Sequence, residues 1–250
     1  RAPDAWIAKA ARLAGEWHET VERVTAPTNA LPSDAQVLGA VNRAAEGPYI
    51  MVCAAGGLPG ELHKLWRATD SVSYHLEYGY SCMGYEIAGG LGAKLAAPER
   101  EVYVLVGDGS YLMMNSEIAT SVMLGAKLII VVLDNRGFGC INRLQRGTGG
   151  APFNNLLDDS APQIDFAAHA RSLGATAEKV DDIAGLEKSL ARAKRAKSTH
   201  VIVIDTDPTR GTEEGGAWWD VAVTAAPRTA AARNARRAYE RARRKQRVGA

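Results

Sequence analysis

The sequence has few cysteines and no long apolar run. Its three cysteines, Cys53, Cys82 and Cys140, lie in separate segments without the spacing of a metal site. Such an odd, sparse count argues against a disulfide framework and is typical of a reducing compartment. The longest strongly apolar run, about residues 128–133, is far shorter than the roughly 20 residues that a membrane helix needs. The N-terminal residues carry scattered charges and do not resemble a secretory signal. We therefore expect a cytoplasmic protein without membrane contact.

The size and composition are those of a globular protein. The chain has 250 residues, enough for one large α/β domain with extensions or for two small domains. Apolar residues make up 46% and charged residues 23%, which is ordinary for a soluble domain. The chain lacks an initiator methionine, so we expect a processed product or part of a longer polypeptide.

Positive charge is concentrated near the C-terminus. The net charge is +2, yet residues 228–247 contain nine Arg or Lys residues and one acid, Glu240. A segment of this kind could bind nucleic acid or an acidic surface, or it could be a solvated helix. It has no interleaved aromatic residues and no groove-reading motif, so we interpret it as a solvated helical extension and expect no nucleic-acid partner.

The pattern along the chain predicts an α/β fold with an open parallel sheet and helices on both faces. Apolar residues from Trp6 to Val24 recur at helical spacing, and Ser33 with Gln36 forms a capping-box pattern that opens a helix ending near Ala45. Continuous apolar strands then alternate with helical segments, which is typical of buried parallel strands. The strands are predicted at residues 49–54, 73–77, 101–106, 127–133, 176–178 and 200–205, and the helices at residues 61–67, 83–96, 115–124, 166–173 and 182–196, with an irregular stretch before residue 166.

Two of these strands end in residues suited to metal and phosphate. Gly107-Asp108-Gly109 follows one strand, and Asp134-Asn135 follows the next. Ligands of open parallel sheets bind beyond the carboxyl ends of the strands, so both segments should face one crevice. A carboxylate and an amide oxygen suit Mg²⁺, and glycines let phosphate oxygens approach backbone N–H groups. Each segment alone is usually a turn or a loop. Together they predict a diphosphate held through a divalent metal.

These motifs resemble those of the thiamine diphosphate (ThDP) enzymes, in which G-D-G is followed at a distance by N-N. Asp134 departs from the usual first Asn, whereas the second Asn, the expected metal ligand, is present as Asn135. The resemblance implies a Mg²⁺ ion bound by Asp108, Asn135 and the Gly137 carbonyl. It also implies that Gly109 and Ser110 lie near the diphosphate, and Gly107, Asn135 and Gly139 are further candidate cofactor-binding residues.

The segment from Tyr80 to Tyr85, with the Gly/Ala-rich stretch after it, resembles the family's G-x-M-G-[FY] motif. By that resemblance, Met83 would lie beneath the cofactor and force its bent shape, and the Ser81 carbonyl would accept a hydrogen bond from the aminopyrimidine. From the residues alone, Met83 would be a core residue, because Met mostly fills gaps. The glycines after the first strand match a loop near the pyrimidine, although a structural turn is an alternative; they are Gly56 and Gly57.

Within the family, several segments look most like trihydroxycyclohexane-1,2-dione hydrolase of myo-inositol catabolism, which opens a cyclic diketone to 5-deoxyglucuronate. They begin at Glu77, Met113, Leu133, Ala151 and Trp218. Hydrolysis needs a group that delivers water. The candidates are His75 and Glu77, although a structural role is an alternative for each. Competing hypotheses are a carboligase or decarboxylase of the acetolactate synthase type, a scaffold that has lost catalysis, and a Rossmann domain, whose G-x-G-x-x-G is matched poorly by residues 55–60.

The resemblance also predicts the domain organisation. It covers about residues 33–205, the diphosphate-binding (PP) domain, whereas the activating glutamate of ThDP enzymes belongs to a separate PYR domain. We therefore predict a linker helix from a missing preceding domain (1–32), a PP domain (33–212) and a C-terminal extension (213–250). A PYR domain from the missing part or a partner chain would complete the site, so the chain alone should be inactive. We also expect a homo-oligomer.

Overall fold

The fold is built on one parallel β-sheet. The structure is a computed structural model that describes residues 2–158, 160–215 and 221–245. Within this part of the chain, the sheet has six strands in the order β2-β1-β3-β4-β6-β5, and all pairings are parallel. The strands are β1 (Tyr49–Cys53), β2 (Tyr74–Leu76), β3 (Glu101–Gly107), β4 (Ile129–Asp134), β5 (Thr176–Val180) and β6 (His200–Asp205). The predicted α/β class with a parallel sheet is confirmed.

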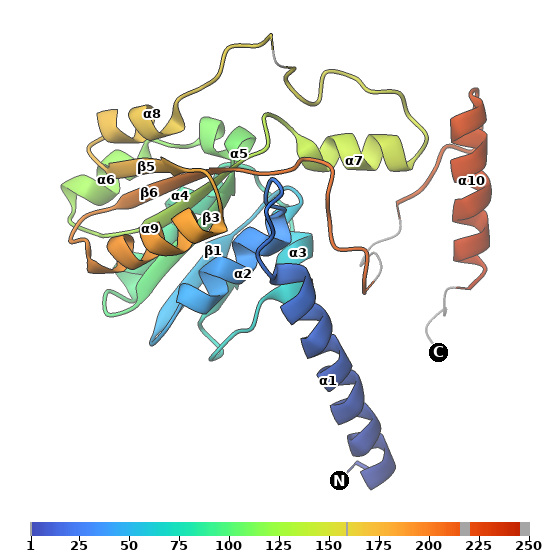
Figure 1. Cartoon of the computed structure of the whole chain (residues 1–250), viewed down its shortest axis with the longest axis horizontal. Helices are drawn as coiled ribbons and strands as arrows, with labels where there is room; N and C mark the ends of the chain where they lie inside the picture. The colour runs from blue at the N-terminus through green and yellow to red at the C-terminus, as the bar shows by residue number, and fades with distance from the viewer. Residues whose placement is uncertain (1, 159, 216–220, 246–250) are drawn as a thin grey trace.

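Helices cover both faces of the sheet (Figure 1). One face packs against α2 (Asp34–Ala44), α3 (Leu58–Leu65) and α9 (Ile183–Arg195). The other face packs against α4 (Tyr85–Ala96), α6 (Glu117–Met123) and α8 (Phe166–Ser172). Two short helices, α5 (Asp108–Met113) and α7 (Gly139–Gly147), follow β3 and β4 directly. The sheet is therefore the middle layer of three, and its strand ends are left for the loops and short helices.

Strand alternation divides the core into two apolar clusters. Tyr103 and Leu105 of β3 join the cluster beneath α2 and α9, whereas Val102, Val104 and Val106 join the cluster beneath α4 and α8. Successive residues of a strand point to opposite faces of the sheet. Because helices cover both faces, all five side chains are fully buried. Burial of one such side chain stabilises the fold by about 1.5–3 kcal/mol.

The strand order places a ligand crevice at the ends of β1 and β3. From β1 the chain returns through α3 to β2 on one side, whereas β3 lies on the other side of β1. Neighbouring strands whose connections leave in opposite directions form a topological switch point, where open sheets bind ligands. The register pairs Gly107 of β3 with Leu133 of β4, so the residues that follow these two strands emerge beside each other.

Several predicted boundaries were wrong, and two helices were not predicted. The strand predicted at residues 73–77 shrinks to Tyr74–Leu76, and the helix predicted at residues 61–67 begins at Leu58 instead. α5 was missed because Gly-Asp-Gly has low helix propensity. α7 occupies part of the stretch predicted to be irregular. It was missed because it spans only nine residues and both begins and ends at a glycine. In contrast, the capping box of Ser33 and Gln36 at the start of α2 is confirmed.

Both ends of the chain form helices that extend from the sheet. The predicted N-terminal helix is α1 (Asp4–Thr25); its last turns pack on the body through Trp17, Val21 and Val24, whereas Trp6 is 63% exposed. The basic extension contains α10 (Ala230–Arg243), which lies beyond the end of α7 (Figure 1). The motif that begins at Trp218 lies mostly outside the described residues. Among the described helices, none combines the length and apolarity needed to cross a membrane.

Candidate functional site

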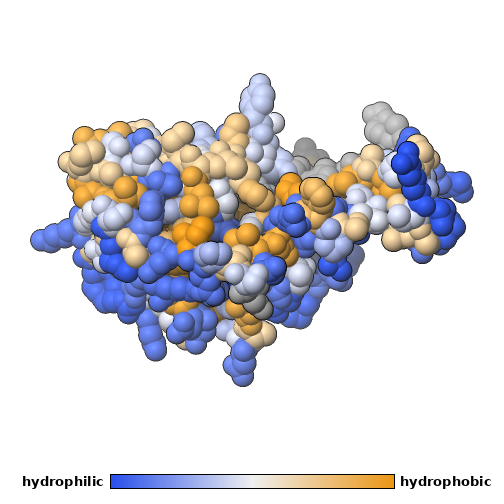
Figure 2. All heavy atoms as spheres, turned by 90° about the horizontal axis from the view of Figure 1, so that it is seen from above, coloured by the Kyte–Doolittle hydropathy of each residue, from blue (hydrophilic) through white to orange (hydrophobic). Residues whose placement is uncertain are grey.

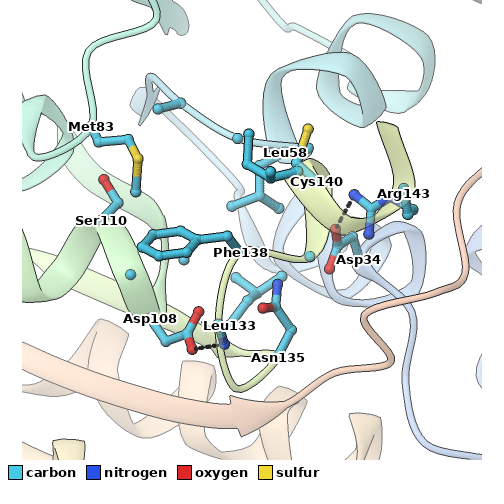
Figure 3. Close-up of a pocket in the computed structure, with 18 of the residues that line it drawn as sticks. Asp34, Leu58, Met83, Asp108, Ser110, Leu133, Asn135, Phe138, Cys140 and Arg143 are labelled. Atoms are coloured by element: carbon cyan, nitrogen blue, oxygen red, sulfur yellow. Dashed lines mark hydrogen bonds and ion pairs between the residues drawn. The ribbon is translucent and has the colours of Figure 1, made fainter. Parts of the chain in front are cut away.

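A cavity of about 310 Å³ opens where β1, β3 and β4 end. Its wall is formed by the loop after β1, the loop before α4, the start of α5, and the segment that runs from the end of β4 into α7 (Figure 3). The predicted site residues that line it are Gly56, Gly57, Ser81, Met83, Gly107, Asp108, Gly109, Ser110, Asn135, Gly137 and Gly139. The fold thus brings together eleven residues from four separate segments of the sequence.

Asp108 and Asn135 each present a buried oxygen atom without a hydrogen-bond partner. The Oδ1 atoms of both side chains are buried and unpaired. The other carboxylate oxygen of Asp108, Oδ2, accepts a 2.7 Å hydrogen bond from the Gly137 N–H group. Burial and the neighbouring Asp134 carboxylate raise the pKa of Asp108 to about 7. A buried oxygen without a donor costs roughly 1–3 kcal/mol, so two such atoms in one cavity indicate an absent positively charged or hydrogen-bonding group.

The donor set fits a magnesium–diphosphate group. A carboxylate and an amide oxygen are ligands that Mg²⁺ accepts, and the ion usually takes further ligands from phosphates and water. Among residues 2–158, 160–215 and 221–245, no group of three His, Cys, Asp or Glu side chains could hold a metal ion. A cation at Asp108 and Asn135 would therefore complete its oxygen shell from other sources, such as a backbone carbonyl, water and a bound diphosphate.

The backbone beside these oxygens leaves room for phosphate. A Cβ atom built on Gly107 would meet no atom within 4 Å, so the space in front of this strand end is open. Gly139, the first residue of α7, lies against the Asn135 side chain, and its built Cβ would be 3.1 Å from Nδ2. The free N–H groups at the start of α7 therefore lie beside Asn135, and helix N-termini favour anions.

The loop before α4 forms another part of the cavity wall. Met83 is 37% exposed, and its Cε atom is 3.6 Å from a Cβ built on Gly109. Ser81 has φ +51° and Gly84 has φ +91°, both left-handed. The Ser110 hydroxyl accepts the Gly84 N–H at 2.7 Å and donates to the buried Glu86 carboxylate at 2.7 Å. The Ser110 hydroxyl therefore joins this loop to α5, and its hydrogen bonds are made within the protein.

His75 and Glu77 do not line the cavity. His75 Nε2 lies 2.7 Å from the Tyr85 hydroxyl, and the two rings stack. The Glu77 carboxylate accepts the N–H groups of Tyr80 and Cys82. These hydrogen bonds lower the pKa of Glu77. The role of either residue in delivering water stays a prediction. The contacts observed for both side chains are to other groups of the protein.

Sequence reasoning missed an ion pair in the cavity wall. Asp34 of α2 and Arg143 of α7 approach to 4.0 Å, and the Arg143 guanidinium also donates to the Pro208 carbonyl at 2.7 Å. Burial raises the pKa of Asp34 to about 6 even though Arg143 opposes the shift. In the sequence, Asp34 is an acid at the start of a helix, and Arg143 lies in the stretch predicted to be irregular. The pattern gave no sign that the two meet.

Glu86 and Phe138 were missed as well. Glu86 is 1% exposed, and its carboxylate accepts hydrogen bonds from the Ala55 and Gly84 N–H groups and from Ser110. The Phe138 ring lines the cavity opposite Met83 (Figure 3). In the sequence, Glu86 is a charged residue within an apolar helix pattern. That was the available signal of a buried carboxylate, which needs hydrogen-bond partners.

Comparison with known proteins identifies the family of this chain. The family described as "Thiamine pyrophosphate enzyme, C-terminal TPP binding domain" matches residues 54–205. Proteins named 3D-(3,5/4)-trihydroxycyclohexane-1,2-dione hydrolase are similar over most of the chain. The one from Bacillus anthracis (strain CDC 684 / NRRL 3495) is 37% identical over an alignment of 246 positions that covers 89% of this chain and 38% of that protein. The one from Clostridium tetani (strain Massachusetts / E88) is 40% identical over an alignment of 222 positions that covers 85% of this chain and 34% of that protein.

A solved structure shares the fold. The thiamine diphosphate-dependent 4-hydroxybenzoylformate decarboxylase of Rhodococcus jostii RHA1 superposes with a TM-score of 0.64 at 22% identity, over 72% of this chain and 33% of that chain. This likeness concerns the fold alone. The chain spans between about a third and two fifths of the length of the curated relatives described above.

Proposed function

The chain belongs to the thiamine pyrophosphate enzyme family, and from that premise we propose that it is the ThDP- and Mg²⁺-binding part of a C–C bond hydrolase. The observation that carries the proposal is the pair of buried, unpaired Oδ1 atoms on Asp108 and Asn135. Both residues line the cavity in which we place the cofactor. The family match also excludes the Rossmann alternative.

Each wall of the cavity has a role in this proposal. Asp108, Asn135 and the Gly137 carbonyl would hold Mg²⁺, which would bridge to the diphosphate. Backbone N–H groups at Gly107, Gly109 and Gly139 would donate hydrogen bonds to the phosphate oxygens, with Ser110 beside them. Bound ThDP supplies a nucleophilic carbon and an electron sink for cleaving a C–C bond beside a carbonyl.

The loop before α4 and the loop after β1 would orient the organic part of the cofactor. Met83 would support the bent cofactor from below, because its side chain reaches over Gly109. The Ser81 carbonyl would accept a hydrogen bond from the aminopyrimidine, and Gly56 and Gly57 would lie near that ring. Phe138 opposite Met83 would exclude water from the reacting carbon.

The proposed substrate comes from the relatives' names. We propose a cyclic 1,2-diketone, trihydroxycyclohexane-1,2-dione, opened to 5-deoxyglucuronate in inositol catabolism in the cytoplasm. Of the two candidates for water delivery, His75 is favoured, because both oxygens of Glu77 already accept backbone hydrogen bonds. His75 would exchange its proton with the Tyr85 hydroxyl, which lies 2.7 Å from its Nε2 atom.

A PYR domain is the proposed partner, from the rest of a longer chain or from another chain in a homo-oligomer. The relatives are much longer than this chain. Large apolar side chains are exposed around the cavity, which supports a covering partner; they include Leu112, Met113, Met114, Phe138 and Ile141. Figure 2 shows apolar atoms gathered on the face seen from above. Exposed apolar patches of this kind mark interaction sites.

The test is product analysis with Mg²⁺ and ThDP. The chain alone, and the chain together with a polypeptide that supplies a PYR domain, would each be given the cyclic diketone or pyruvate. We expect ring opening only with the PYR domain present. Condensation or decarboxylation of pyruvate without ring opening would favour the acetolactate synthase-like alternative, and no turnover with ThDP bound would favour a scaffold.

A further inference from the structure

The loop of residues 78–84 between β2 and α4 holds a backbone conformation that its sequence does not favour. Ser81 lies at φ +51°, in the left-handed region that residues with a Cβ atom rarely adopt. Ser81 lines the cavity, and Met83 follows two residues later. The cavity wall therefore depends on an unfavourable conformation, which persists only where surrounding contacts enforce it.

Glu77 makes the contacts on both sides of Ser81. Its Oε1 atom accepts the Tyr80 N–H at 3.0 Å, and its Oε2 atom accepts the Cys82 N–H at 2.9 Å. The Glu77 N–H donates to the Cys53 carbonyl at 3.1 Å, which ties this residue to the end of β1. One carboxylate thus spans the left-handed residue and connects it to the sheet.

The far end of the loop is fixed from inside the protein. The Gly84 N–H donates to both Ser110 and Glu86, at 2.7 and 3.1 Å. The other Glu86 oxygen accepts the Ala55 N–H at 3.2 Å. Gly84 is therefore tied to the ends of β1 and β3, whereas Ser81 depends on Glu77.

We propose that Glu77 is a positioning residue that holds Ser81 left-handed and thereby presets the cavity wall for the organic part of ThDP. The inference rests on the proposed function, because it takes ThDP as the occupant. It replaces the water-delivering role predicted for Glu77. The hydrogen bonds from Tyr80 and Cys82 also lower the pKa of Glu77, so its carboxylate stays ionised and keeps both N–H groups bound.

The experiment compares Glu77→Ala, Glu77→Gln and the exposed control Glu99→Ala in the full chain. Amide hydrogen exchange at Tyr80 and Cys82 reports whether their N–H groups are still bound by the Glu77 carboxylate. Calorimetry with Mg²⁺–ThDP and Mg²⁺–pyrophosphate reports the affinity of the cavity for each ligand. Pyrophosphate tests the diphosphate site alone, because it has no organic part that would reach the loop of Ser81. In Glu77→Ala we expect both amides to exchange about tenfold faster or more, with ThDP affinity reduced about tenfold and pyrophosphate affinity unchanged.

Glu77→Gln and one additional double variant sharpen the test. Glu77→Gln keeps one acceptor oxygen, so its effects should lie between those of wild type and Glu77→Ala. Adding Ser81→Gly to Glu77→Ala should restore most of the ThDP affinity, because glycine adopts positive φ freely. Unchanged amide exchange in Glu77→Ala, or equal losses of ThDP and pyrophosphate affinity, would overturn the inference. If the wild type bound neither ligand even with the PYR-domain polypeptide present, the proposed function would fail, and amide exchange would still decide whether Glu77 holds the loop.

Discussion

The Asp108 carboxylate accepts a 2.7 Å hydrogen bond from the Gly137 N–H group, which joins the segment after β3 to the segment after β4. One carboxylate oxygen thus fixes the loop that carries Asn135, and the other remains unpaired in the cavity. In the proposed site, the same side chain would therefore both fix the neighbouring loop and supply a ligand atom.

Replacing Asp108 should remove metal-dependent cofactor binding. In Asp108→Ala, we expect affinity for Mg²⁺–ThDP to fall by more than the 10- to 100-fold that loss of a ligand's supporting partner typically costs. Calorimetry with and without Mg²⁺ measures this. Asp181→Ala, which removes an exposed carboxylate after β5, should bind like the wild type. Full affinity in Asp108→Ala would refute the metal assignment.

Two glycines of the site should respond differently to a methyl group. A Cβ atom on Gly137 would be 2.4 Å from the Asn155 carbonyl oxygen, at φ +143°, so Gly137→Ala should lower the free energy of unfolding by about 2 kcal/mol or more. Gly107 has φ −76° and open space, so Gly107→Ala should change stability by less than about 0.5 kcal/mol yet weaken Mg²⁺–pyrophosphate binding. Urea unfolding and calorimetry separate the two effects. Equal stability losses would contradict the steric argument.

Asp34 should make stability depend on pH. Burial raises its pKa from 3.8 to about 6, so the folded protein holds this proton more tightly than the unfolded chain does. The resulting stabilisation is fully present below about pH 4 and is lost as the pH rises through about 6. Relative to Asp34→Asn, the wild type should lose on the order of 2–3 kcal/mol between pH 4 and pH 7.5. A difference between wild type and variant that stays constant with pH in urea unfolding would contradict this sign.

Met83→Ala should impair turnover more than folding. The Met83 side chain is 37% exposed, so its loss should cost no more than about 1 kcal/mol of unfolding free energy. Turnover by the chain with a PYR domain should fall, because the cofactor would lose its support. Met123→Ala removes a 77% exposed methionine on α6 and serves as the control for both thermal melting and rate. A wild-type rate in Met83→Ala would remove this residue from the mechanism.

The site was predictable where its residues directly follow apolar strands. Asp108 and Asn135 could be placed together because parallel strands end at one edge of a sheet, and the apolar runs marked those strands. α5 and α7 could not be predicted, because glycine-rich starts and short length conceal helices whose stability comes from tertiary packing.

By itself, the sequence determined the parallel α/β architecture, the family, and the carboxylate and amide beyond two strand ends. These features depend on local apolar patterns and on motifs that are continuous in the chain. Only the tertiary structure decided that Asp34 meets Arg143 and that Glu77 spans Ser81. The first pair lies 109 residues apart, and the second contact depends on a left-handed backbone. Neither long-range packing nor the sign of φ at a serine is written in local residue patterns.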